Sequence, residues 1–192
     1  YLTNKSIDVG EYKNDLYNTK LLFSRVNSLM GQEKPKKYLV IFQNNMEIRP
    51  TGGFIGSFGL ITFDKGKLTD INISDVYSAD GQLKGHVDPP EPIRRYLGEG
   101  GWYLRDSNWD PSFPVSAQKA EWFLDKEISE KVDGVISVDL FFVRNLLKVT
   151  GPITLTDFDK KIDENNLYSL IQSEVEDTFF PGSIKKTTIL TS

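Results

Sequence analysis

The sequence predicts a layered α/β domain, with helices on both faces of a mixed central sheet (an α/β/α arrangement). Three observations lead to this fold class. The run "YLVIF" at 38–42 has the length and β-branched content of a buried strand. Strand-like and helix-like patterns alternate through most of the chain, which favours some parallel pairing. The segment "VDGVISVDLFFVRNLLKVTGPITL" alone reads as a strand, a helix and another strand.

The first predicted element is an amphipathic helix over 14–30, which we expect to pack on another part of the protein. Gly31 follows the helix as a stop. The apolar residues of the helix lie near one stripe; they are Leu16, Leu22, Phe23, Val26, Leu29 and Met30. Three further helices are expected. One begins at Ser112 or Pro114, the second has Asp139 as its N-cap and stops at Gly151, and the third has Asp163 as its N-cap.

Between the first strand and these later helices we expect a β-hairpin and a long irregular segment. "SFGLITF" and "LTDINIS" flank a turn at Lys65 and Gly66, a pattern typical of a hairpin. Residues 75–101 contain three prolines and several glycines, and a loop of this length is usually functional or mobile.

The 192 residues suffice for one globular unit, with an N-terminal helix and linker at 1–36 and the α/β domain at 37–192. The chain begins with Tyr1 rather than Met, and we expect it to be a segment of a longer protein. A formal charge of -4 gives no electrostatic basis for binding nucleic acid. The absence of cysteine removes thiol nucleophiles and cysteine metal sites, and the single histidine, His86, lies in a proline-rich loop where a solvated role is expected.

The glycine-rich segment "NNMEIRPTGGFIGSFG" at 44–59 is the first candidate site. It lacks the Gly-Lys-Ser/Thr ending of a nucleotide-binding P-loop. Arg49 still offers a permanently charged fork that matches phosphate or carboxylate, and the adjacent Thr51, Gly52 and Gly53 are candidate ligand-binding residues. In the alternative, Arg49 pairs with Glu47 or Asp106, and the glycines only permit the turn.

The segment "LRDSNWDPSFP" concentrates polar side chains beside tryptophans. Oxygen ligands on an irregular segment suit Mg²⁺ or Ca²⁺, while an aromatic-flanked Arg105 suits a sugar or phosphate. Asn108 and Trp109 are further ligand-binding candidates. In the alternative, Asp110 and Ser112 make a capping network for the following helix.

Two aspartates in "SDVYSADGQL" are supporting candidates. Paired carboxylates can divide acid and base work, so Asp75 and Asp80 could act together, and Asp75 with Asp106 is the candidate pair of ligands for Mg²⁺. In the alternative, Asp80 and Gly81 make an ordinary turn.

Three strings resemble the bacterial domain-of-unknown-function family 4012. They are "NNMEIRPTGGFIGSFGLITFDKGKL", "LRDSNWDPSFPVSAQKAEWF" and the closing strand-helix-strand segment, and together they cover about 38–155. The resemblance supplies no activity. It implies an extracytoplasmic domain of a larger bacterial protein, anchored in the membrane by a helix that precedes this chain.

The order of these elements is also similar, more distantly, to the LytR-CpsA-Psr family, which transfers glycopolymers from a polyprenyl-pyrophosphate carrier to the cell wall. This likeness implies that Arg49 and Arg105 bind pyrophosphate and that Asp106 is a catalytic or Mg²⁺-binding residue. The family's Ser-Ile-Pro-Arg-Asp string is absent here, where the chain has "INISDVYSAD" without an arginine.

Two functions follow as hypotheses. In one, the domain is a relative of glycopolymer phosphotransferases, with a pocket in which Arg49, Arg105 and Asp106 serve a phosphorylated or anionic glycan or lipid-linked ligand; turnover is left open. In the other, it is a non-catalytic envelope module that binds glycan or protein, and Arg49 and Asp106 form a buried pair.

Overall fold

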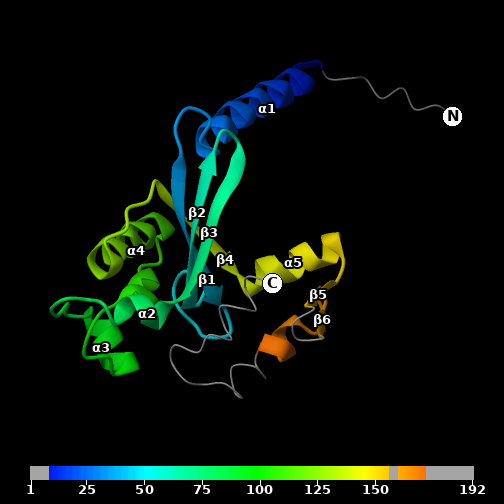
Figure 1. Ribbon diagram of the computed structural model, residues 1–192. Coiled ribbons are helices and arrows are strands. Elements are labelled where there is room, and N and C mark those ends of the chain that lie inside the picture. Colours follow the sequence, from blue (N-terminus) through cyan, green and yellow to red (C-terminus); the bar gives the residue numbers. More distant parts are fainter. Residues whose placement is uncertain (1–8, 156–159, 172–192) are drawn as a thin grey trace. The chain divides into compact units, whose positions relative to one another are not determined.

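The computed structural model describes residues 9–155 and 160–171, and its main sheet has four strands in the order β3-β2-β1-β4 (Figure 1). β1 and β4 pair in parallel, with Tyr38 opposite Gly134 and Gln43 opposite Asp139. The strands are β1 (Lys36–Asn44), β2 (Phe54–Asp64), β3 (Lys67–Asp75) and β4 (Gly134–Asp139). This mixed central sheet, flanked by helices, confirms the predicted α/β fold class.

The predicted hairpin is present, whereas the predicted irregular segment is partly helical. Lys65 and Gly66 join β2 to β3 with positive φ values of 51° and 78°, as a two-residue hairpin turn requires. The segment after β3 contains two short helices, α2 (Val76–Asp80) and α3 (Glu91–Leu97). The prolines misled the prediction because proline is also well suited to the first turn of a helix, which is where α3 carries one.

Both helices around β4 begin at a predicted residue, and α5 also ends at the predicted Gly151. α4 (Phe113–Ile128) has Ser112 as its N-cap residue, and α5 (Leu140–Thr150) begins where an oxygen of Asp139 accepts a 2.7 Å hydrogen bond from the Phe142 amide. After α5 the short strands β5 (Ile153–Leu155) and β6 (Lys160–Ile162) pair antiparallel. Asp163 accepts bonds from two amides before a helical turn at 167–171, and the rest of the last predicted helix lies outside the described residues.

The core lies between the sheet and the helices that follow β3. Its buried side chains come from β1, β2, α2, α4 and the 3₁₀-helical segment η1 (Leu104–Trp109). They are Leu39, Ile41, Ile55, Phe58, Val76, Ala79, Leu104, Ala120, Phe123 and Leu124. Because α2, η1 and α4 also pack on one another, the polar residues of η1 are held against two helices.

The described residues form two compact units, one of 9–36 with 62–70 and the other of 37–61 with 71–155 and 160–171. The first holds α1 (Val9–Leu29), which corresponds to the predicted amphipathic helix. The predicted packing of its stripe is not found among the described side chains: Leu16, Phe23, Val26 and Leu29 are exposed, and the Leu22 side chain lies outside them. The chain after α1 instead contacts the hairpin turn through backbone, since the amides of Lys65 and Gly66 donate to the carbonyls of Gly31 and Met30.

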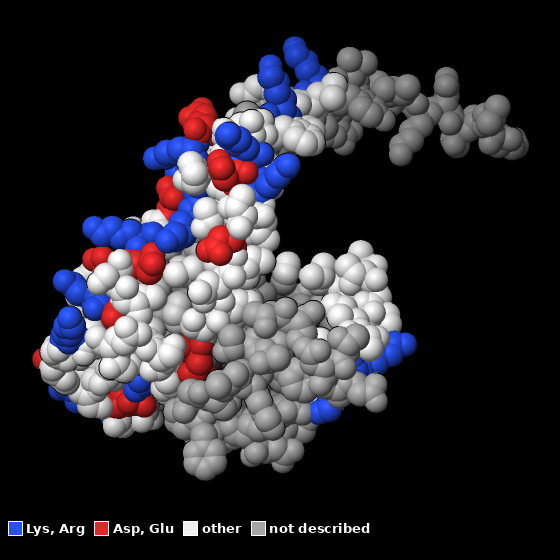
Figure 2. Space-filling view, viewed as in Figure 1, with Lys and Arg blue, Asp and Glu red and all other residues white. Residues whose placement is uncertain are grey.

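On the face shown in Figure 2, basic and acidic side chains lie beside one another on the described surface. Within the described part of the chain, no helix has the length and apolar content needed to cross a membrane.

Candidate functional site

The loop between β1 and β2 depends on two glycines with left-handed backbone. Gly53 has a φ of 114°, and a Cβ there would lie 2.1 Å from the Asn44 carbonyl oxygen. Gly52 has a φ of 84°, and a Cβ there would lie 2.5 Å from the side-chain oxygen of Gln43. The Gln43 amide fills this space and donates to the Thr51 carbonyl. The glycines therefore allow the loop to fold back on the end of β1.

Asn108 connects this loop to η1. Its amide nitrogen donates to the carbonyls of Thr51, at 3.1 Å, and Gly53, at 2.7 Å. In return, the Thr51 hydroxyl donates to the Asn108 carbonyl at 2.9 Å. These three bonds satisfy polar groups that burial would otherwise leave unpaired, so the loop and η1 behave as one structural element.

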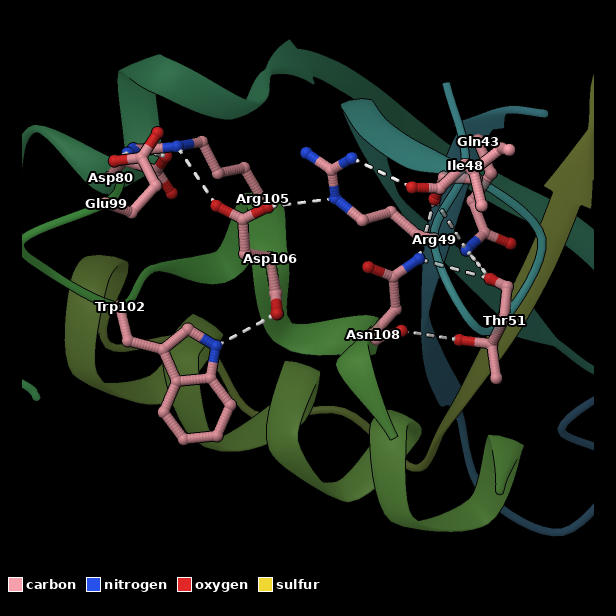
Figure 3. A network of polar contacts seen from close by, with 11 residues as sticks. Gln43, Ile48, Arg49, Thr51, Asp80, Glu99, Trp102, Arg105, Asp106 and Asn108 are labelled. Atoms are coloured by element: carbon pink, nitrogen blue, oxygen red, sulfur yellow. Dashed lines mark hydrogen bonds and ion pairs between the residues drawn. The ribbon is translucent and has the colours of Figure 1, made fainter. Parts of the chain in front are cut away.

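Arg49 points from the same loop toward Asp106. Its Nε donates to Oδ1 of Asp106 at 3.2 Å, and Nη1 donates to the Ile48 carbonyl at 3.0 Å (Figure 3). The guanidinium also lies 5.2 Å from the centre of the Phe54 ring. The side chains of Arg49 and Asp106 are 13% and 2% exposed, which makes this a buried pair. Of the two predicted partners, Asp106 is the one found; Glu47 instead accepts a hydrogen bond from Asn44.

Arg105 lies on the other side of Asp106 and has three carboxylate neighbours (Figure 3). Nη1 donates to Asp80 at 2.8 Å, Nη2 donates to Glu99 at 2.9 Å, and Nε is 3.4 Å from Oδ2 of Asp106. The guanidinium also lies 4.4 Å from the centre of the Tyr103 ring and 5.6 Å from that of Tyr77. Aromatic faces and carboxylates thus surround this cation.

The carboxylates of this network outnumber its guanidinium groups. Two guanidinium groups face three carboxylates, those of Asp80, Glu99 and Asp106. Burial raises the pKa of Asp106, and the positive charges of Arg49 and Arg105 oppose that rise. Burial likewise raises the pKa of Asp80 to about 6, against the hydrogen bond and charge of Arg105. The network therefore carries no uncompensated positive charge.

Asp75 and Asp106, the carboxylates predicted to bind Mg²⁺, each make other contacts in the structure. Among the described residues, no set of three or more His, Asp or Glu side chains is arranged to hold a metal ion. Asp75 is the N-cap of α2 and accepts a 2.9 Å bond from the Tyr77 amide, while both oxygens of Asp106 face arginines. These carboxylates serve the fold in the described structure, and the function proposed below uses no metal.

The structure brings together most of the predicted site residues and gives them mutual contacts. Arg49, Thr51, Gly53, Asp106 and Asn108 join two segments of the chain, and Arg105 extends the network toward α2. Trp109 is half-buried at the end of η1, and His86 lies outside the network, 61% exposed and 3.2 Å from Asp88.

Sequence reasoning missed Gln43, Glu99 and Glu127. Gln43 was recognisable as a polar residue directly after a buried apolar run, and Glu127 as a charge on the apolar stripe of α4. Glu99, between Gly98 and Gly100, gave no comparable signal.

Comparison with known proteins identifies a family. A family model described as "Protein of unknown function (DUF4012)" matches residues 33–175. No curated protein and no solved structure matches the chain.

Proposed function

Because the chain belongs to this family of proteins of unknown function (DUF4012), over residues 33–175, its role has to be argued from its own residues, and we propose that it binds an anionic glycan without turning it over. In this proposal a phosphate or carboxylate group of the ligand pairs with Arg105. The observation that carries the proposal is the hydrogen bond from Nη2 of Arg105 to the carboxylate of Glu99, because an anionic group of a ligand could take the place of this carboxylate.

Glu99 is the exchangeable partner of Arg105. The side chains of the other two carboxylates, Asp80 and Asp106, are 4% and 2% exposed, whereas that of Glu99 is 37% exposed. Glu99 also lies between Gly98, with a φ of 70°, and Gly100, and neither glycine has a neighbouring atom within 4 Å of an added Cβ. A loop with this freedom can move its carboxylate aside at little steric cost, which leaves the arginine fork open to an external anion.

The same geometry favours binding over catalysis. Oδ1 of Asp106 faces Arg49 and Oδ2 faces Arg105, so neither oxygen is available as a base. Arg49 is occupied by Asp106 and by its neighbouring carbonyl of Ile48. These two residues are best explained as positioning groups that hold η1 and thereby aim Arg105.

The identity of the ligand and the location of the protein are further parts of the proposal. The resemblance to the LytR-CpsA-Psr family supports a cell-wall or polyprenyl-pyrophosphate-linked glycan as the ligand. The resemblance to family 4012 supports an extracytoplasmic position, with a membrane anchor elsewhere in the larger protein.

The test is a thermal-shift titration with inorganic pyrophosphate and with farnesyl pyrophosphate, each with and without Mg²⁺. We expect saturating ligand to raise the melting temperature of the wild type, because binding to the folded state adds stability. Arg105→Met should abolish the rise, and Glu99→Gln should give tighter binding by removing the competing carboxylate. The matched control is Arg94→Met, since Arg94 is a 60% exposed arginine outside the network. No rise for the wild type at saturating ligand would overturn the proposal.

A second candidate function, a module that binds a protein, is favoured by a different observation. α5 exposes a continuous apolar face, formed by Phe141, Phe142, Leu146 and Val149, and such faces often mark interaction surfaces. Two results together would favour this second function. The thermal-shift titration would show no rise in melting temperature, and Phe142→Asp, but not Arg105→Met, would lose binding to a protein partner.

A further inference from the structure

Glu127 is a buried carboxyl group without an obvious charge partner. It lies on the stripe of α4 that carries Ala120, Phe123 and Leu124 into the core, and it is only 4% exposed. Oε1 accepts a 3.0 Å hydrogen bond from the Leu104 amide at the start of η1. Oε2 is buried and has no hydrogen-bond partner among the described residues. An ionised carboxylate in such a position would be strongly disfavoured.

Asp80, on α2, has a matching unpaired oxygen. Its Oδ2 accepts from Arg105, whereas its Oδ1 is buried and has no partner in the part of the chain that is described. α2 and α4 pack on each other, and the negative charge of Asp80 acts on Glu127. Burial, followed by this charge, raises the pKa of Glu127 to about 8.

We propose that Glu127 is a positioning residue that carries a proton on Oε2 and donates it to Oδ1 of Asp80. Asp80 remains ionised and keeps its other oxygen on Arg105. The proton satisfies both unpaired oxygens at once, and the Asp80–Glu127 pair then carries one negative charge against the one positive charge of Arg105.

The surrounding groups explain why a proton, rather than a second cation, completes this pair. α2 contributes Tyr77, η1 contributes Arg105 and Asp106, and the preceding loop contributes Glu99. Arg49 is the remaining cation of the network, and it faces Asp106. Ionisation of Glu127 would add a buried negative charge beside Asp80 with no cation left to match it.

The sign of the pH effect follows from the raised pKa. Between the ordinary glutamate range and about pH 8, the folded protein holds a proton on Glu127 that the unfolded chain has released. Folding stability contributed by this site therefore falls as the pH rises through that interval. Above about pH 8 the stability contributed by the Glu127 proton is lost, and the ion pair between Asp80 and Arg105 weakens.

The experiment measures the protonation of Glu127 directly and then its consequence. A carboxyl-carbon NMR titration of the wild type, assigned with Glu127→Gln, should show Glu127 titrating well above the ordinary glutamate range. Urea unfolding should show a loss of stability from about pH 6 to about pH 9 in the wild type that is absent in Glu127→Gln, whose amide supplies the donor at every pH. Glu127→Leu fills the space without a donor and should be less stable than Glu127→Gln at both pH values.

A normal titration of Glu127, or an unchanged pH slope in Glu127→Gln, would overturn the proposal. Glu130→Gln, at a half-buried carboxylate that pairs with Lys37, is the control and should keep the wild-type slope. These readouts need no ligand, so the proposal stands or falls independently of anion binding at Arg105.

Discussion

The Nε atom of Arg49 lies 3.2 Å from Oδ1 of Asp106, although 57 residues separate the two in the sequence. Asp106 uses its other oxygen toward Arg105, at 3.4 Å. One buried carboxylate thus sits between two arginines that come from different segments. The pair fixes the loop after β1 against η1, and Glu99, with a side chain that is 37% exposed, is the most exposed of the three carboxylates that contact Arg105.

Removing the Asp106 carboxylate should strongly destabilise the protein. Asp106→Ala leaves two largely buried arginines without their shared partner, and breaking such a pair typically costs about 3 to 5 kcal/mol. The free energy of unfolding in urea measures this loss. Glu130→Ala removes the partner of Lys37, in a pair whose two side chains are each 38% exposed, and should cost no more than about 1 kcal/mol. Equal, small losses in both variants would show that the Asp106 network does not hold the fold.

Replacing the side-chain NH₂ of Asn108 with an oxygen should destabilise the protein, although the shape of the side chain is kept. Asn108→Asp keeps the shape of the side chain but replaces the nitrogen that donates to the Thr51 and Gly53 carbonyls with an oxygen. The new oxygen would face two carbonyl acceptors that keep only their hydrogen bonds from the Gln43 amide, and this should cost about 2 kcal/mol or more in the free energy of unfolding. Asn72→Asp, on the exposed part of β3, is the matched control and should change stability by about 0.5 kcal/mol or less. A similar response of the two variants would contradict the bonds assigned to Asn108.

Two glycines with positive φ should respond differently to alanine. Gly85 has a φ of 92° and no atom within 4 Å of an added Cβ, so Gly85→Ala should cost only the conformational term, about 1 to 2 kcal/mol. At Gly53 the added Cβ would also collide with the Asn44 backbone, which should add about 1 to 3 kcal/mol. Thermal or urea unfolding of both variants checks this order. A smaller loss for Gly53→Ala than for Gly85→Ala would disprove the close approach of this loop to β1.

Asp80 should contribute a pH-dependent part of the stability. Because burial raises its pKa from 3.8 to about 6, the folded state binds more protons than the unfolded state between those values. Stability of the wild type should therefore fall as the pH rises through this window. Asp80→Asn has no carboxyl group to titrate at this position. Its free energy of unfolding should therefore rise by roughly 2 to 3 kcal/mol relative to that of the wild type as the pH increases through this window.

The check for Asp80 is a series of urea unfolding curves from about pH 4 to about pH 7. Asp88→Asn, which changes a side chain that is 80% exposed, should show the same dependence of stability on pH as the wild type. Parallel curves for Asp80→Asn and the wild type would mean that Asp80 titrates normally.

Much of the fold was predictable because its elements carry local signals. The apolar run before Gln43, the turn at Lys65 and Gly66, and the cap at Asp139 each depend on residues within a few positions of one another. α2 and α3 escaped prediction because they are short and lie among residues typical of loops: Gly81 follows α2, Pro90 and Gly98 flank α3, and α3 itself contains Pro92.

The candidate site was only partly predictable. The sequence by itself identified Arg49, Arg105, Asp106 and Asn108 as unusual, and it offered Asp106 as one of two partners for Arg49. The tertiary structure decided between these partners, and it alone brought Asp80, Glu99 and Glu127 around Arg105. The reason is physical: local patterns follow from the geometry of neighbouring residues, whereas pairing of buried charges depends on how distant elements pack and on which carboxylates that packing removes from water.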